Sequence, residues 1–272
     1  MTVRGVGAVA SVELSKLLAQ FKARVALVAC AAGPFAFAAA MRVQSSVPED
    51  TLFGRSVRES GFALSLVVLG FGAFWVFPLL GSIVGGDVFS AEDRYGTWKT
   101  VLTRSRRRSE VFAGKVGAAL SFSLLAITVL AVSSIAAGLL LIGSGPLVSL
   151  SGSLLPASRA VTRVTLAWMS VLPPMFGMTA VAILVSVATR NSAAGIGLPV
   201  VAALVMQLYA LVDGPEIVRR LLITSAFGAW HGLLAEPQYH SPLVYSTTVS
   251  CAYVVVSLAI AYRLLQRRDI TA

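Results

Sequence analysis

The sequence predicts an all-α polytopic membrane protein with six transmembrane helices. Hydrophobic residues make up 57% of the 272 residues, charged residues make up only 12%, and the mean hydropathy is +0.83. A soluble globular chain carries about 25% charged residues and does not expose so much apolar surface. The apolar stretches lack the alternating pattern of membrane-spanning strands, which favours helices over a barrel.

Six stretches contain no Asp, Glu, Lys or Arg and can cross about 30 Å of hydrocarbon at about 1.5 Å per residue. They are residues 25–41, 61–86, 116–142, 164–189, 191–212 and 243–262. Arg190, which alone separates the fourth stretch from the fifth, predicts a tight turn at the membrane surface.

The basic residues predict the orientation of these spans. With the N-terminus inside, the cytoplasmic segments hold 15 of the 22 Lys and Arg residues. Positive charge favours the cytoplasmic side of a membrane. We therefore expect both termini in the cytoplasm, and the net charge of +10 needs no nucleic acid to explain it. No cleaved signal peptide is expected, because the chain starts without a short apolar core and a small-residue cleavage site.

Residues 3–24 predict an amphipathic helix that lies on the inner leaflet and leads into the first span. One face of this helix is apolar, and the other holds serine, lysine and glutamine. The apolar face would comprise Val6, Ala10, Leu14, Leu17, Leu18 and Phe21. The helix would be either a plain anchor or a lever that moves during a transport cycle.

Small residues, prolines and cysteines inside the spans also carry predictions. Gly33-Pro34 predicts a kink or a shallow insertion of the first span, and Pro78 and Pro173-Pro174 predict bends. Gly81 and Gly85 indicate close helix packing, with a dimer seam as the alternative. Cys30 and Cys251 are expected to pack in the core and to form neither a disulfide nor a metal pair.

The outer segment 213–242 differs from the other outer loops, which are short and polar or rich in glycine and serine. Its middle is apolar and is interrupted by glycines and prolines. We expect one or two short re-entrant helices that dip into the outer leaflet, where protein or a water-filled cavity covers them. His231 and His240 lie there and are interpreted as interfacial polar residues, with a metal site as the less favoured alternative.

The spans contain no ionisable side chain in their interior. Ion-coupled carriers normally need such a group, although sodium can also be held by backbone carbonyls. We found no histidine cluster with metal-ligand spacing, no hydrolase motif and no phosphate-binding loop. The sequence therefore predicts a protein that is not an enzyme and binds no cofactor or metal, so any nucleotide would be bound by another polypeptide.

The hydrophilic segment 89–110, FSAEDRYGTWKTVLTRSRRRSE, separates the second and third spans. Ser90 could cap a short helix with Glu92 and Asp93 in its first turn, where carboxylates favour the free amides. The segment is acidic at one end and basic at the other, with aromatic residues between. It would be either a docking element or a solvated loop whose arginines only fix the orientation.

This segment resembles the signature of type-2 ABC transporter permeases, the membrane subunits of exporter-like ATP-binding-cassette systems. In that family an acidic residue, a Gly-Thr pair, a small-Ser-Arg element and a lysine follow the second span. Here these are Glu92, Gly96-Thr97, residues 105–108 and Lys115. The family's usual proline before the Ser-Arg element is missing. The sequence VSVATRNSAAGIGL at 185–198 resembles the family's turn between spans four and five, and the resemblance covers the whole chain.

The resemblance implies that residues 87–115 form a cytoplasmic coupling segment, with a coupling helix that sits in a cleft of a separate ATPase. Two ATPase copies would bind ATP and Mg, and a second copy of this chain or a related permease would complete the pathway. The expected ATPase contacts are Ser90, Glu92, Asp93, Arg94, Tyr95, Gly96, Thr97, Trp98 and Leu102. The basic residues expected where the chain returns to the bilayer are Arg106, Arg107, Arg108 and Lys115. Glu92→Lys is expected to uncouple ATP hydrolysis from transport.

The expected location is the bacterial cytoplasmic (inner) membrane. The uncharged spans suggest an amphipathic or hydrophobic cargo such as a drug, lipid or peptide. Export is favoured because the outer loops hold no docking domain for a binding protein. Two alternatives remain: an ion-coupled secondary carrier, and a membrane scaffold or sensor that transports nothing.

Overall fold

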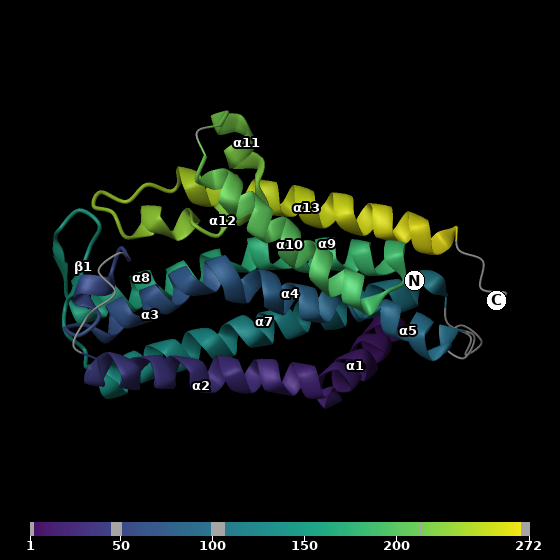
Figure 1. Cartoon of the computed structure of the whole chain (residues 1–272), viewed down its shortest axis with the longest axis horizontal. Coiled ribbons are helices and arrows are strands. Elements are labelled where there is room, and N and C mark those ends of the chain that lie inside the picture. The colour runs from purple at the N-terminus through teal and green to yellow at the C-terminus, as the bar shows by residue number, and fades with distance from the viewer. Residues whose placement is uncertain (1–2, 45–50, 99–106, 213, 268–272) are drawn as a thin grey trace.

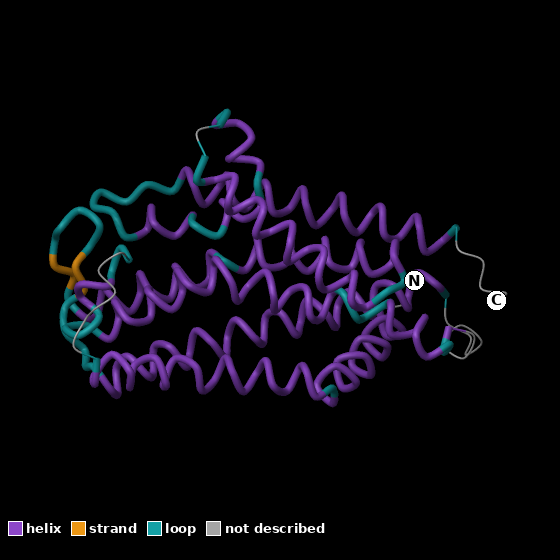
Figure 2. Tube along the Cα trace, in the orientation of Figure 1, coloured by secondary structure: helices purple, strands orange, loops and turns teal. Residues whose placement is uncertain are grey.

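The computed structural model of the chain describes residues 3–44, 51–98, 107–212 and 214–267, and most of these residues are helical (Figures 1 and 2). Six helices in these ranges are long and apolar enough to cross a membrane. They are Phe21–Val43, Gly61–Gly85, Arg108–Leu141, Ala157–Thr189, Ser192–Ala210 and Ser241–Gln266. The prediction of an all-α, multi-pass membrane protein is confirmed at this level. The third helix begins before residue 116, so Lys115 lies within it.

Helix α1 (Val3–Ala19) packs against α7 (Arg108–Leu141), and so does α2 (Phe21–Val43). Gln20 has extended backbone angles and separates α1 from α2. Because the helix is interrupted there, the predicted apolar face does not continue to Phe21. Leu17 is buried, as a residue of that face should be, but Phe21 is 82% exposed.

The second span is built from three pieces. Helix α3 (Gly61–Phe71) leads into a π-helical turn, η2 (Gly72–Val76), and then into α4 (Phe77–Gly85). Pro78 stands in the first turn of α4. A side-chain Cβ at Gly85 would lie 2.5 Å from the carbonyl oxygen of Thr179 in α9 (Leu172–Thr189). The close-packing interpretation of the Gly81 and Gly85 pair is therefore confirmed within one chain.

The fourth span is interrupted next to its prolines. Helix α8 (Ala157–Ser170) ends before Val171, and α9 begins with Pro173-Pro174 in its first turn. Helix α9 contacts α4, α10 (Ser192–Ala210) and α13 (Ser241–Gln266). The tight turn predicted at Arg190 is confirmed, because Arg190 adopts a left-handed conformation with φ of 56°. The Asn191 side chain then accepts from the amides of Ala193 and Ala194.

Short elements lie toward one end of the bundle or project from it. They are η1 (Gly54–Ser56), the hairpin β1 (Leu147–Val148) and β2 (Leu154–Leu155), and the helical turns α11 (Glu216–Leu221), α12 (Ile223–Ala226) and η3 (Ala229–Leu233). The sequence did not predict the hairpin. Of these turns, α12 and η3 bury apolar side chains, whereas α11 has no buried residue and projects from the bundle (Figure 1).

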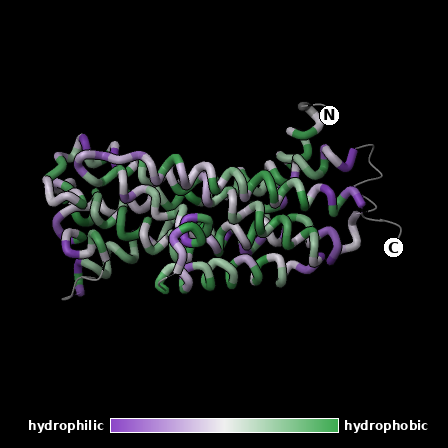
Figure 3. Tube along the Cα trace, turned by 90° about the horizontal axis from the view of Figure 1, so that it is seen from above, coloured by the Kyte–Doolittle hydropathy of each residue, from purple (hydrophilic) through white to green (hydrophobic). Residues whose placement is uncertain are grey.

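The opposite end carries α5 (Ser90–Tyr95), the start of α1 and the end of α13 (Figure 1). The hydrophilic residues gather at the two ends of the bundle and on α11, and hydrophobic residues dominate the length between the ends (Figure 3). Cys30 is buried, as expected, but Cys251 is exposed on α13. The core-packing prediction for Cys251 was wrong because its side of α13 is not covered by another helix of this chain.

Candidate functional site

Helix α5 follows α4 after a short turn and is attached to the α9–α10 turn through Ser90. The Ser90 hydroxyl donates to the Gly86 carbonyl oxygen at 2.7 Å and lies 2.9 Å from the Ser192 hydroxyl. The Ser90 amide donates to the Ser186 hydroxyl at 3.1 Å. The N-cap residue is Phe89, so the prediction that Ser90 caps the helix was wrong. Ser90 is fully buried, and its side chain bonds to Gly86 and Ser192 instead of capping α5.

The base of α5 also requires a close approach of two backbones. A Cβ at Gly86 would lie 2.4 Å from the carbonyl carbon of Gly195, and a Cβ at Gly195 would lie 2.4 Å from the Gly86 oxygen. No side chain fits between the two backbone segments at this crossing, so glycine is needed on both sides. The crossing therefore fixes the start of α5 against α10.

Gly96 ends α5 with a left-handed conformation, at φ of 63°. Its amide and that of Thr97 turn back onto the last carbonyl oxygens of the helix, with Thr97 N 3.0 Å from Glu92 O. This is the Schellman type of helix end, which glycine stabilises because it adopts positive φ without steric cost. The turn brings the Thr97 hydroxyl back to the Glu92 carboxylate, to which it donates.

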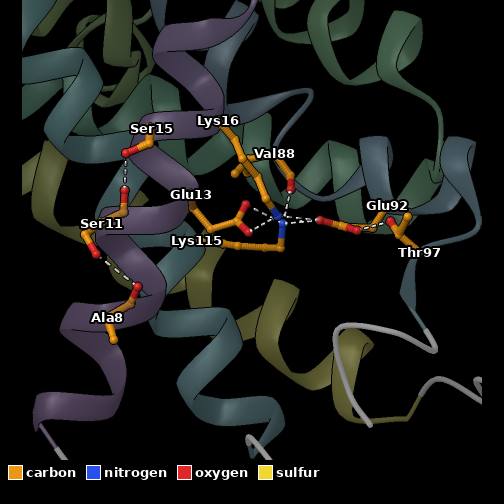
Figure 4. A network of polar contacts seen from close by, with 9 residues as sticks. All are labelled: Ala8, Ser11, Glu13, Ser15, Lys16, Val88, Glu92, Thr97 and Lys115. Carbon is orange, nitrogen blue, oxygen red and sulfur yellow. Dashed lines mark hydrogen bonds and ion pairs between the residues drawn. The ribbon is translucent and has the colours of Figure 1, made fainter. Parts of the chain in front are cut away.

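A buried lysine of α7 contacts both α1 and α5 and so connects three helices (Figure 4). The Lys115 Nζ atom of α7 lies 2.8 Å from Glu13 Oε2 of α1 and 2.8 Å from Glu92 Oε1 of α5. It also donates to the Val88 carbonyl oxygen at 3.0 Å. An ammonium has three N–H donors, and each has an acceptor here. Lys115 is only 1% exposed, so this pairing is what allows its charge to be buried.

The two glutamates have further partners. Lys16 Nζ lies 2.7 Å from Glu13 Oε1 and 3.8 Å from Glu92 Oε1. Burial alone would raise the pKa of Glu92, but the Lys115 ammonium and the hydrogen bonds from Lys115 and Thr97 hold it below its usual range. We call Glu13, Lys16, Glu92 and Lys115 the lysine–glutamate cluster; with all four ionised it has no net charge.

Asp87 forms a second ionic contact between α2 and α5. Its carboxylate is 1% exposed and lies 2.7 Å from Lys22 Nζ and 3.1 Å from Arg94 Nη2. Burial would raise the Asp87 pKa, but the hydrogen bonds from Lys22 and Ser192 and the charges of Lys22 and Arg94 lower it. The carboxylate therefore stays ionised at neutral pH. Together, Asp87, Ser90 and the lysine–glutamate cluster join the α5 region to α1, α2, α7, α9 and α10.

The structure separates the predicted docking residues into an inner and an outer set. Buried are Ser90, Glu92, Trp98 and Lys115; partly buried are Asp93, Thr97 and Arg108; exposed are Arg94, Tyr95, Gly96 and Arg107. Leu102 and Arg106 lie outside the described residues. Within the outer set, the Arg94 guanidinium lies 5.0 Å from the centre of the Tyr95 ring. Arg108 donates to the Gln266 carbonyl oxygen and so connects α7 with the end of α13.

Residues 27–271 match a family described as proteins of unknown function, DUF2705. The chain belongs to the DUF2705 family. A search of curated proteins found no significant match. The DUF2705 match covers Glu92 and Lys115, whereas their partners Glu13 and Lys16 precede it in the chain.

Sequence reasoning on this DUF2705 chain did not find Glu13, Lys22 or Asp87 as site residues. One signal was available for Glu13: it is the one acidic residue in the sequence 3–24, and it stands three residues before Lys16, with which it pairs across one helical turn. The Lys22 partner of Asp87 and the Glu13 partner of Lys115 come from helices far away in sequence, so no local pattern marks these two contacts. A cavity of about 420 Å³ lies beside these residues, between α1 and α5. Within the described ranges, no group of three or more His, Cys, Asp or Glu side chains could hold a metal ion.

Proposed function

We propose that this chain is the membrane-spanning permease subunit of an ATP-driven transporter of the ABC type, with ATP and Mg bound by a separate ATPase subunit. One observation carries the proposal. Helix α5 presents Arg94, Tyr95 and Gly96 outward while its inner face is bonded to other helices of the bundle. A solvated loop that only fixes orientation does not need such attachment.

The attachment makes α5 suited to transmit force. A displacement of α5 would act on α7 and α1 through Glu92 and Lys115, and on α9 and α10 through Ser90. Buried ionic and hydrogen-bonded contacts are stronger than exposed ones because the surroundings have a low dielectric constant. A partner that pushes on α5 would therefore move several span helices together.

The resemblance to type-2 permeases supplies the remaining parts of the proposal. The end that carries α5 would face the cytoplasm of a bacterial inner membrane, in agreement with the basic residues counted there. Two ATPase copies and a second permease chain would complete the complex. The cargo would be an exported amphipathic or hydrophobic compound such as a drug, lipid or peptide. Arg94 and Arg107 favour an acidic rim on the ATPase cleft.

The test is association with an ATPase. We expect the chain to co-purify from detergent extracts with a soluble ATPase encoded beside its gene. Tyr95→Ala, which removes an exposed ring (72%), should reduce this association about tenfold or more and lower the stimulated ATP hydrolysis, as expected for an interface hot spot. Tyr239→Ala, at a half-exposed tyrosine in the chain between η3 and α13, is the matched control and should leave association unchanged.

Glu92→Lys is a poor test of docking. It would place a second ammonium against Lys115, so a loss of function could come from the chain itself. The proposal would be overturned if the purified chain transports cargo with an ion gradient and no ATPase, which would favour the secondary carrier. The docking role proposed for α5 would fail if Tyr95→Ala leaves ATPase association and hydrolysis at wild-type levels.

A further inference from the structure

An apolar pocket of about 420 Å³ lies at a distance from α5, between the second span and the short helices that follow α10. Leu66 of α3 and Phe74 of η2 form one wall, and Gln207 of α10 forms another. The remaining walls come from residues 51–53 before η1 and from the region of α12 and η3, which contributes Thr224, Trp230 and His231. Pockets of this size hold drug-sized molecules.

The lining of this pocket carries no formal charge. It includes no Asp, Glu, Lys or Arg side chain. His231 is its one basic residue among those described, and burial lowers the pKa of the imidazole despite a hydrogen bond to Gly228 O. The imidazole is therefore neutral at physiological pH. An ionised ligand group would lose its hydration here without gaining a counter-charge.

Two polar groups of the lining lack partners. The Trp230 side chain is 3% exposed, and its indole N–H has no hydrogen-bond acceptor among the described residues. The buried Thr224 hydroxyl has no partner there either. Most buried donors in folded proteins are paired, so each exception requires an explanation. An indole N–H can only donate, so what is missing at Trp230 is an acceptor.

Two comparable polar groups do have hydrogen-bond partners in the described residues. Gln207 Nε2, in the same lining, donates to the Phe74 carbonyl oxygen of η2 at 2.7 Å. Trp168 is equally buried on α8, and its indole N–H donates to the Ser65 hydroxyl at 3.0 Å. The pocket wall also includes part of the π-helical turn, and such turns frequently occur at functional sites.

We propose that this pocket binds an uncharged, lipid-like molecule whose carbonyl oxygen accepts a hydrogen bond from the Trp230 indole, with the Thr224 hydroxyl as a second polar contact. The apolar walls would hold its hydrocarbon part. The inference does not depend on the proposed transport function, because it concerns only the chemistry of this lining.

The experiment measures binding to the purified full chain in nanodiscs, with neither nucleotide nor ATPase present. The probes are dioctanoylglycerol, which is uncharged and has ester carbonyls, dioctanoyl phosphatidic acid, which has the same chains and an anionic phosphate, and hexadecane, which has no acceptor. Trp230→Phe removes the N–H and keeps an aromatic ring. Trp168→Phe is the matched control, because its N–H is already bonded elsewhere.

We expect dioctanoylglycerol to bind Trp230→Phe about tenfold more weakly than wild type, since the loss of one hydrogen bond has about this effect. Trp168→Phe should bind it with unchanged affinity. Hexadecane should not distinguish Trp230→Phe from wild type, and phosphatidic acid should bind wild type at least tenfold more weakly than dioctanoylglycerol.

The proposal is overturned if wild type does not bind dioctanoylglycerol, if Trp230→Phe binds it as tightly as wild type, or if phosphatidic acid binds more tightly. Should Trp230→Phe fail to fold, Thr224→Val gives the same readout, because it removes a hydroxyl at nearly constant volume. A failure of ATPase association would leave all these results unaffected.

Discussion

The lysine–glutamate cluster and the apolar pocket lie toward opposite ends of the molecule and differ in how their buried donors are paired. Beside α5, Lys115 is buried with three acceptors within 3.0 Å, and its glutamate partners have further donors. In the apolar pocket, Trp230 is almost equally buried, yet its N–H has no acceptor among the described residues. The Lys115 ammonium is fully paired within this chain, whereas the Trp230 N–H is not paired among the described residues.

This difference indicates what each region can do. A satisfied ionic cluster loses stability when any member is removed, so it suits a rigid joint between helices. An unpaired donor has already lost its water and gained nothing in return, so its removal from the free protein has little cost. Removing a polar group is therefore expected to lower the free energy of unfolding strongly at the lysine–glutamate cluster and only slightly at Trp230.

Lys115→Met gives the largest expected effect. It removes the ammonium that neutralises Glu13 and Glu92 and leaves two buried carboxylates facing each other. Breaking a buried ion pair in this way costs about 3–5 kcal/mol. The free energy of unfolding in detergent micelles, followed by circular dichroism, measures the loss.

Two variants control this experiment. Lys16→Met removes a lysine that is 53% exposed, and should change the free energy of unfolding by about 1 kcal/mol or less. The triple variant Glu13→Gln, Glu92→Gln, Lys115→Met removes the charges together and should recover part of the loss. Wild-type stability of Lys115→Met alone would show that the cluster does not join the helices.

The contrast between the ends also explains what could be predicted from the sequence. The six spans follow from length and uncharged composition, because the bilayer imposes both. The Arg190 turn and the Gly85 contact follow from local patterns. The contacts of Glu13 with Lys115 and of Asp87 with Lys22 were missed because they join different helices. Ser90 was assigned as a cap because its bonds to Ser186 and Ser192 are equally non-local.

The apolar pocket was harder still to foresee. Trp230 occurs in an apolar stretch with glycines, AFGAWHGLL, which predicts short helices but says nothing about hydrogen bonds. An unpaired donor is defined by what surrounds it in three dimensions. The sequence made no prediction for Trp230 itself, and only the fold shows that nothing described receives its N–H.

Acid should remove the contribution that Glu92 makes to the free energy of unfolding. The pKa of Glu92 is lower in the folded chain than in the unfolded one, so its stabilising contribution is present above the unfolded value, about 4.3. That contribution is lost as the pH falls through the lowered folded-state value. Each unit by which the pKa is lowered is equivalent to about 1.4 kcal/mol.

Thermal melting in micelles between pH 7 and the acid range measures this loss. Glu92→Gln, which cannot ionise, should melt at a lower temperature than wild type at pH 7 and should show a flatter acid profile. The two proteins should converge as the pH falls. Parallel profiles for wild type and Glu92→Gln would mean that Glu92 does not carry the pH dependence.

The smallest expected effect is the difference in stability between variants of Trp168 and Trp230. Trp168→Phe breaks the hydrogen bond to Ser65 and should reduce the free energy of unfolding by about 1 kcal/mol. Trp230→Phe removes an N–H that has no acceptor among the described residues, so the ligand-free chain should lose less than Trp168→Phe, although both changes remove the same atoms. Denaturant titration of the two variants side by side measures the difference. If Trp230→Phe is the more destabilised, its N–H must already be satisfied within the chain, and the contrast between the two ends fails.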